Sequence, residues 1–385
     1  MQPKLLAMAA GVAVATVYFA QPLLVTIGAD LGIAAGTVGL FVTVTQAGYG
    51  LGLFFLVPLG DLLDRRRLIQ LQFLLLAAAL LATGLAQNAA MLLLGLATVG
   101  TLAVVTQSLV AYGAALADPA RRGRAVGTIT TGIVLGILLA RTTSGILTDL
   151  LGWRAVYLAA CATCLAIALL FTRRSAPAPL GAGSVPTYGQ LLRSTVGLWR
   201  EPLFRESAFR AFFVFASFST LWTSIALPLT QRGLSHTEIG AFGLIGAAGA
   251  LAAGPAGRLA DRGQGRIVVI GASMLLATSW LVTAHSLVGL AIGAVLLDLA
   301  VQAIHVTNQS LIYRPDAGSR LIGGYMVFYS LGSAVGAIAS TALYERAGWT
   351  AVCVLGAAFG AGSLLSSVRG ARRTSRASRP CGSSR

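Results

Sequence analysis

The sequence predicts an all-α membrane protein with twelve transmembrane helices, arranged as two six-helix bundles related by pseudo-two-fold symmetry. The first observation is composition: 56% of the 385 residues are hydrophobic and 10% are charged, whereas an average soluble domain is roughly 25% charged. The second is a series of apolar runs about 20 residues long, which is enough to span a bilayer as a helix. The third is an internal repeat, in which Gly60-Asp61-Leu62-Leu63-Asp64-Arg65 is echoed by Gly257-Arg258-Leu259-Ala260-Asp261-Arg262. A period this long indicates a duplicated domain.

Each apolar run is expected to be a helix, because lipid offers the backbone no hydrogen-bonding partner and the runs are too long for barrel strands. The first run contains Tyr18, Gln21 and Pro22, so we expect an uncleaved helix and not a signal peptide. The predicted helices of the first half are 5–27, 38–59, 68–85, 91–116, 125–147 and 155–171. Those of the second half are 208–229, 239–256, 267–284, 287–313, 321–343 and 351–368.

The loops alternate strongly in charge. When they are assigned to the two sides in turn, nearly all of the 28 Lys and Arg residues fall on one side, which also receives both termini. The positive-inside rule makes that side cytoplasmic. The net charge of +16 is therefore explained by topology, and no nucleic-acid partner is implied.

The predicted domain organisation has four parts. An N-terminal bundle covers 1–174 and a C-terminal bundle covers 207–368. Between them, 175–206 forms a cytoplasmic linker that starts rich in Pro, Ala and Gly and continues as an amphipathic helix on the membrane surface. The tail 369–385 is rich in Arg and Ser, and we expect it to be disordered and attracted to anionic lipid.

The motif Gly60-Asp61-x-x-Asp64-Arg65-x-Arg67, between the second and third helices of two six-helix halves, closely resembles the signature of the major facilitator superfamily. The run Val17-Tyr18-Phe19-Ala20-Gln21-Pro22-Leu23-Leu24 and the motif Leu151-Gly152-Trp153-Arg154 are most similar to the bacterial branch of sugar-efflux and drug-efflux permeases. The resemblance implies two bundles around a central cavity. It also implies a monomeric multi-pass protein of the bacterial plasma (inner) membrane.

The loop signature is predicted to work as a conformational latch formed by Gly60, Asp61, Asp64, Arg65 and Arg67. A carboxylate is stabilised at a helix N-terminus, so Asp61 can hold the start of the eleventh helix while the cavity faces outward. The alternative is a solvated turn. In the second copy Arg258 replaces Asp61, so only the first half is expected to carry a strong latch.

Two motifs of the efflux branch are incomplete. The fourth helix reads Leu96-Ala97-Thr98-Val99-Gly100 and lacks the arginine that usually precedes the glycine. The fifth helix keeps Gly132 and Gly136, but its usual proline is missing and Arg141 replaces the last glycine. These departures weaken the interpretation as a standard drug/proton antiporter.

Three ionisable residues in the apolar runs are candidates for proton coupling, because such groups are costly in hydrocarbon and usually face a cavity or a partner. Asp298 lies near the middle of the tenth helix, and His305 lies two turns further on nearly the same face, so the two are expected to form a proton-carrying pair. The alternative for Asp298 is a packing charge paired across the bundle. Arg141 is placed in the outer third of its helix, where it either snorkels to the interface or acts in transport.

Neutral polar and aromatic side chains on the cavity-lining helices are the candidates for substrate binding, because amides and phenols hydrogen-bond a solute without charge. They are Tyr18, Gln21, Gln46, Tyr49, Gln107, Gln302, Tyr325 and Tyr329. No metal site is expected, because Cys161 and Cys164 are accompanied by no His or acid. No phosphate loop of the form Gly-x-x-x-x-Gly-Lys-Ser/Thr occurs, so no cofactor is expected and energy must come from a gradient, which we expect to be a proton gradient.

The leading hypothesis is a secondary active transporter that exports a small organic solute, such as a sugar, drug or metabolite, in exchange for protons. Uptake by proton symport or uniport is an alternative of the same class. A receptor or scaffold that has lost transport is an alternative of another class. An enzyme is disfavoured, because the three histidines and the single clear membrane acid assemble no catalytic set.

Overall fold

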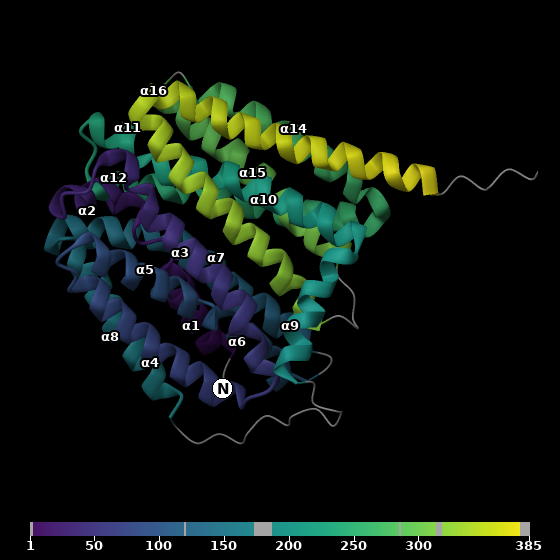
Figure 1. The fold of residues 1–385 in the computed structure, drawn as a ribbon, viewed down its shortest axis with the longest axis horizontal. Helices are drawn as coiled ribbons and strands as arrows, with labels where there is room; N and C mark the ends of the chain where they lie inside the picture. Colours follow the sequence, from purple (N-terminus) through teal and green to yellow (C-terminus); the bar gives the residue numbers. More distant parts are fainter. Residues whose placement is uncertain (1–2, 119–120, 173–186, 285, 313–317, 378–385) are drawn as a thin grey trace, which may run out of the picture.

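The computed structural model describes residues 3–118, 121–172, 187–284, 286–312 and 318–377, with backbone only for 318–320 and 370–377. The first part of the predicted linker and the end of the predicted tail lie outside these residues. The chain forms two helical halves packed side by side, the N-terminal half in purple and blue and the C-terminal half in green and yellow (Figure 1).

The first two spans of the N-terminal half are each broken into shorter helices. Pro22 starts a 3-10 turn that interrupts the predicted first helix, because proline removes a backbone donor. The first span consists of α1 (Pro3–Ala15), η1 (Gln21–Leu23) and α2 (Leu24–Asp30). The second consists of η2 (Ala35–Thr37), α3 (Gly39–Phe55) and η3 (Val57–Asp61).

The other four spans of this half are more regular. Asp64 caps the third span by accepting a hydrogen bond from the Arg67 amide at 2.8 Å. These spans are α4 (Arg65–Gly84), α5 (Ala89–Ala103) with α6 (Val105–Leu116), α7 (Arg122–Leu151) and α8 (Trp153–Leu170).

The C-terminal half repeats this plan after the linker helix. Its elements are α9 (Tyr188–Gly197), η5 (Leu198–Arg200), α10 (Pro202–Ser224), α11 (Ala226–Gln231), α12 (His236–Phe242), η6 (Gly243–Gly246), α13 (Ala247–Leu259), η7 (Ala260–Gln264), α14 (Gly265–Thr283), α15 (Leu287–Ile312) and α16 (Gly318–Ala377). The last helix continues into the segment predicted to be disordered. Its Arg- and Ala-containing sequence extends an existing helix, which requires no new nucleation.

The number of spans agrees with the prediction of twelve. Nine helical stretches in the described residues are long and apolar enough to cross a membrane. Two of them contain two spans each, because the backbone turns at Gly263 (φ 80°) and at Gly348 (φ 70°), a conformation that favours glycine. The broken first span completes the set.

Gly152, at φ 82°, makes the equivalent turn between α7 and α8. The next two residues fasten this turn to the first span: Trp153 Nε1 and Arg154 Nη1 donate to Asp30 Oδ2 at 3.1 Å and 2.6 Å. The hydrogen bond from Arg154 holds the pKa of Asp30 below its usual range.

Glycines allow the backbones of paired helices to approach closely within each half. A side chain at Gly132 would collide with the carbonyl of Ala7, and one at Gly136 would collide with the backbone of Gly11, so α1 and α7 lie in direct contact. In the C-terminal half, Gly332 of α16 lies in the same way against Phe212 of α10. Small residues commonly occupy such interfaces in membrane bundles.

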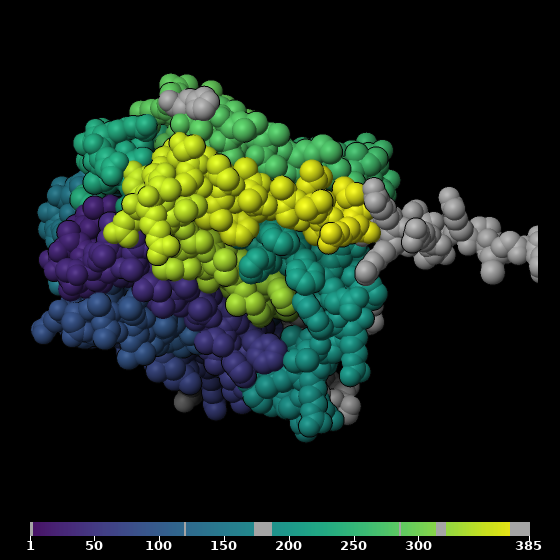
Figure 2. All heavy atoms as spheres, turned by 45° about the horizontal axis from the view of Figure 1, so that its top comes forward, coloured from purple at the N-terminus to yellow at the C-terminus, as the bar shows by residue number. Residues whose placement is uncertain are grey.

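The linker helix α9 lies where the two halves meet, in teal beside the purple N-terminal half (Figure 2). The end of the molecule at which α4, α7 and α14 begin, with Arg65, Arg122 and Arg266, is called here the basic end. The Tyr188 hydroxyl donates to the Phe55 carbonyl of the N-terminal half at 2.9 Å. After α9, Trp199 stacks on Phe328 of the C-terminal half with centroids 5.1 Å apart. The linker therefore contacts both halves.

Candidate functional site: the central cavity

A cavity of about 750 Å³ lies between the two halves. It is lined from the N-terminal half by α1, α3, α6 and α7, and from the C-terminal half by α10, η6, α13, α15 and α16. Its lining runs from Arg141 and Asp298 to Val126, Ser310 and Ile322, which lie near the basic end of their helices. The cavity therefore extends from the interior toward the basic end.

Arg141 lies at the deep end of the cavity, on α7, and its side chain is only 4% exposed. Its Nε donates to Gln21 Oε1 at 2.7 Å, and its guanidinium carbon lies 4.2 Å from the centroid of the Trp222 ring. The side chain therefore points across the seam and does not snorkel to the outer interface. Counting residues along the helix could not predict the direction of its side chain.

Asp298 lies on α15 and is 6% exposed. Its Oδ1 accepts a hydrogen bond from Trp222 Nε1 at 3.0 Å. Gly246 and Gly249 lie against it, and a side chain at Gly246 would come within 2.7 Å of Oδ2. None of the four ion pairs among the described residues, all within 4.0 Å, includes Asp298 or Arg141.

His305 also lines the cavity, and its hydrogen bonds go to residues other than Asp298, so the proton-carrying pair stays a prediction. Its Nδ1 is hydrogen-bonded to the Tyr325 hydroxyl at 3.1 Å, and its Nε2 to Gln309 Nε2 at 3.1 Å. Its ring meets Phe215 edge-on at 5.2 Å. Asp298 and His305 are thus each hydrogen-bonded to other residues.

Six of the eight predicted substrate contacts line the cavity: Tyr18, Gln46, Tyr49, Gln107, Gln302 and Tyr329. The other two lie behind the wall, where Gln21 positions Arg141 and Tyr325 positions His305. The hydroxyls of Tyr18 and Tyr329 are 2.7 Å apart and bridge the halves.

The sequence reasoning missed Trp222, which contacts both Arg141 and Asp298, and the neighbouring Phe215 and Phe218 in the lining. These three aromatic residues follow helical spacing on one face of α10. That spacing was the signal available in the sequence, but by itself it is equally typical of a packed core.

The predicted latch residues form a network within the N-terminal half, at the basic end. Arg65 pairs with Asp61 at 3.1 Å and donates from Nε to the Gly60 carbonyl at 2.9 Å. It also reaches the Ala111 carbonyl of α6 at 3.4 Å. The side chain of Arg320, beside which Asp61 was expected to act, lies outside the described residues, so the latch stays a prediction.

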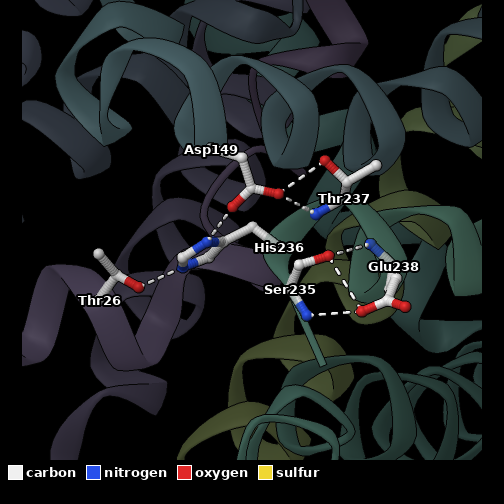
Figure 3. A network of polar contacts seen from close by, with 6 residues as sticks. All are labelled: Thr26, Asp149, Ser235, His236, Thr237 and Glu238. Atoms are coloured by element: carbon white, nitrogen blue, oxygen red, sulfur yellow. Dashed lines mark hydrogen bonds and ion pairs between the residues drawn. The ribbon is translucent and has the colours of Figure 1, made fainter. Parts of the chain in front are cut away.

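The opposite end is closed by a polar cluster that joins the halves, called here the clasp: Thr26 and Asp149 of the N-terminal half with His236 and Thr237 of the C-terminal half (Figure 3). Asp149 Oδ1 is 2.6 Å from His236 Nδ1, and its Oδ2 accepts from the Thr237 amide and hydroxyl at 2.8 and 2.7 Å. Thr26 binds the other ring nitrogen of His236 at 2.5 Å.

Close helix contacts support the clasp at the same end. Gly145 of α7 lies against the backbone of His236, and Thr142 donates to the Gly240 carbonyl at 3.1 Å. On the other side of the seam, Thr341 of α16 donates to the Gly36 carbonyl at 3.1 Å. The clasp was not predictable from the sequence, because its two sides lie on helices far apart in the chain.

Comparison with known proteins agrees with this architecture. The family model of the Major Facilitator Superfamily matches residues 6–307 and 207–380. The chain is 43% identical over 377 residues to the "Putative uncharacterized transporter YgaY" of Escherichia coli, covering 96% of this chain and 95% of that protein. It is 34% identical over 383 residues to a "Probable transporter" of Streptomyces coelicolor, covering 96% and 87%.

Among solved structures, the fold is similar to that of a bacterial homologue of the human lysosomal transporter Spinster, with a TM-score of 0.72 and 16% identity, covering 94% of this chain and 93% of that chain. Two six-helix halves, a cavity on their seam and a matching family model lead to one conclusion. The chain belongs to the major facilitator superfamily and is a membrane transporter, not an enzyme.

Proposed function

We propose that this transporter exports a small organic solute in exchange for protons, by alternating access of the central cavity. The observation that carries the proposal is Asp298, the only carboxylate among the described residues that line the cavity. An ionisable group at membrane depth that faces a cavity is the usual site of proton exchange in such proteins.

The orientation follows from charge. With the basic end in the cytoplasm, as the positive-inside rule requires, both termini are cytoplasmic and the clasp lies on the outer side of a bacterial plasma membrane. The cavity is then open inward, where a solute from the cytoplasm is captured. Export is also the direction implied by the resemblance of the 17–24 run to the efflux branch.

Exchange at Asp298 has a simple physical basis. One carboxylate oxygen is held by Trp222 and the other accepts no hydrogen bond from a described residue, so a proton and a solute compete for the same acid. The titratable groups that share the cavity lining with it are Arg141 of α7, Tyr18 of the first span, Tyr49 of α3, Tyr329 of α16 and His305 on its own helix. A ligand that binds one conformation better than another shifts the equilibrium between them. Each exchange of a proton for a solute therefore drives the halves from one conformation to the other.

The test is solute-dependent proton movement in everted membrane vesicles, with a panel of labelled solutes and an imposed pH gradient. We expect solute accumulation in wild type that stops when the gradient is collapsed. Asp298→Asn should abolish this coupling while the protein still inserts, and Asp261→Asn, an exposed aspartate at the basic end, should retain it.

Flux that ignores a collapsed gradient, or normal coupling in Asp298→Asn, contradicts the proposal. Accumulation driven in the opposite direction identifies uptake, and the absence of flux for every solute favours the receptor or scaffold alternative.

A further inference from the structure

Arg141 holds hydrogen-bonding capacity that the protein does not use. Only its Nε has a partner, Gln21 Oε1, and Nη2 is buried with no hydrogen-bond partner among the described residues. A buried donor without a partner has lost its hydrogen bonds to water without replacement, so such groups are normally satisfied by something that binds there. The unused side of the guanidinium is the planar fork that matches a carboxylate with two parallel hydrogen bonds.

The fork is held in place by three neighbouring side chains. The guanidinium lies 4.2 Å from the Trp222 ring centroid and 5.4 Å from that of Tyr18, and Gln21 anchors it from behind. Aromatic faces on two sides stabilise a cation without neutralising its charge. The site therefore presents a fixed positive charge at the deep end of the cavity.

Asp298 offers the complementary half of the site. Trp222 occupies Oδ1, whereas Oδ2 accepts no hydrogen bond from any described residue. Gly246 and Gly249 pack against this residue, because neither carries a side chain that would collide with it. An acceptor is thus available for a group that donates hydrogen bonds, such as an ammonium.

The two charges are close without forming an ion pair. Both contact Trp222 and they interact electrostatically, yet no nitrogen of Arg141 lies within 4.0 Å of Asp298. A purely structural pair in a low-dielectric interior would gain most by direct contact, since Coulomb energy rises as distance falls. Separation by an indole keeps each charge available to a third group.

We propose that the solute is a small zwitterion, whose carboxylate binds the Arg141 fork and whose ammonium binds Asp298, with an apolar or aromatic body in the rest of the cavity. The inference rests on the proposed function, since it names the solute that the transporter carries.

The remaining lining suits such a body. Phe215, Phe218, Ile137, Leu138 and Val17 supply apolar and aromatic surface beside the two charges. A volume of about 750 Å³ lies within the range of roughly 300–1,000 Å³ that small-molecule sites occupy. A larger body than that of a simple amino acid therefore also fits.

The arrangement connects binding to the conformational cycle. Arg141 belongs to the N-terminal half and Asp298 to the C-terminal half, so a bound zwitterion bridges the seam. A proton on Asp298 removes the partner of the ammonium, which places proton and solute in competition at one atom. This is the exchange that the proposed function requires.

The first test holds the body constant and removes one charge at a time. Binding to the full-length protein in lipid nanodiscs is measured by titration calorimetry for L-phenylalanine, for L-phenylalaninamide, which lacks the carboxylate, and for N-acetyl-L-phenylalanine, which lacks the ammonium. We expect the zwitterion to bind at least about tenfold more tightly than either analogue. The same order is expected for L-leucine and its two analogues.

The second test assigns each charge to its residue. Arg141→Gln should lower the affinity for L-phenylalanine to that for the amide and leave the amide unaffected, whereas Asp298→Asn should equalise L-phenylalanine and its N-acetyl derivative. Such cycles isolate one pairwise interaction. Arg141→Lys keeps the charge but loses the fork, so its affinity for L-phenylalanine should lie between those of wild type and Arg141→Gln. Arg232→Gln and Asp261→Asn remove exposed charges and should keep the full preference.

The proposal is overturned if, in both the phenylalanine and the leucine series, the zwitterion binds no more tightly than one of its analogues. It is also overturned if no compound of either series binds. Wild-type measurements decide the matter even if a variant fails to fold. If the zwitterions do not bind but another solute moves with the proton gradient, only the substrate class is lost. If they bind as expected but flux ignores the gradient, only the proton coupling is lost.

Discussion

Trp222 is the residue on which the candidate site depends. Its ring stacks on the Arg141 guanidinium and its Nε1 donates to Asp298, so one side chain of the C-terminal half positions the two charges on opposite sides of the seam. Trp222 has two separable roles, because the ring face and the N–H group act on different partners.

Trp222→Phe separates these roles, since it keeps a ring face and removes the donor. Hydrogen bonds to charged groups contribute about 1.5–3 kcal/mol, so we expect a comparable loss in the free energy of unfolding and a marked fall in solute-driven proton flux. The measurements are denaturant unfolding of the purified protein and proton flux in everted vesicles.

A matched control exists in the same chain. Trp153 Nε1 also donates to an aspartate, Asp30, but outside the cavity. Trp153→Phe should lower stability and leave the flux per folded protein unchanged. Equal flux in Trp222→Phe and wild type would contradict a role for the indole N–H in transport.

At the scale of elements, α1 and α7 position the cavity wall. Their backbones touch at Gly132 and Gly136, and the same helix α7 carries Arg141 further along. Because α7 cannot move away from α1 without losing this contact, the pair is expected to move as one body when the halves rock.

Gly132→Ala tests that contact. The added methyl group meets the Ala7 carbonyl, which belongs to backbone and cannot turn away, so we expect a loss of about 1–3 kcal/mol in the free energy of unfolding. Gly127→Ala lies on the same helix with no atom within 4 Å of the new methyl group. It should be neutral or stabilise by up to about 1 kcal/mol. Similar destabilisation by both changes would show that the effect is not one of packing.

The whole molecule is closed at one end by the clasp and open at the other. Four side chains from α2, α7 and α12 close the clasp end, whereas the loop signature at the basic end forms contacts within its own half (Figure 3). The clasp and the latch are thus expected to alternate, each stabilising one of the two conformations of a rocking transporter.

Asp149→Ala should weaken the present conformation, because it removes the acceptor for both His236 and Thr237. Spin labels at the exposed positions Leu150 and Arg232, one on each half, report the distance across the clasp end by pulsed electron resonance. We expect a new population at longer distance. Asp30→Ala, which removes a carboxylate paired within its own half, should leave the distribution unchanged. An unshifted Asp149→Ala distribution would rule out the clasp as the closing contact.

Asp61→Ala should act in the opposite direction. If Asp61 stabilises the conformation with the basic end closed, its loss reduces the long-distance population that the same label pair detects in the Asp149→Ala background. A double variant indistinguishable from Asp149→Ala alone would favour the solvated turn.

The membrane architecture was predictable from the sequence because its causes are local. Long apolar runs specify spans, because it is costly to expose apolar side chains to water or an unpaired backbone to lipid. The turns between spans are marked by the Arg-rich loops, by the repeated motif and by Gly152 and Gly348. The interruption of the first span at Pro22 and the continuation of α16 to Ala377 altered boundaries but not topology.

By itself, then, the sequence determined two six-helix halves and the asymmetry of charge between the loops. Only the tertiary structure decided that Arg141 points inward to Trp222, that His305 pairs with Tyr325 and not with Asp298, and that Asp149 meets His236. The reason is physical: transfer energy and helical period act along a single segment, whereas these contacts join helices distant in sequence, at glycine-dependent approaches that periodicity does not encode.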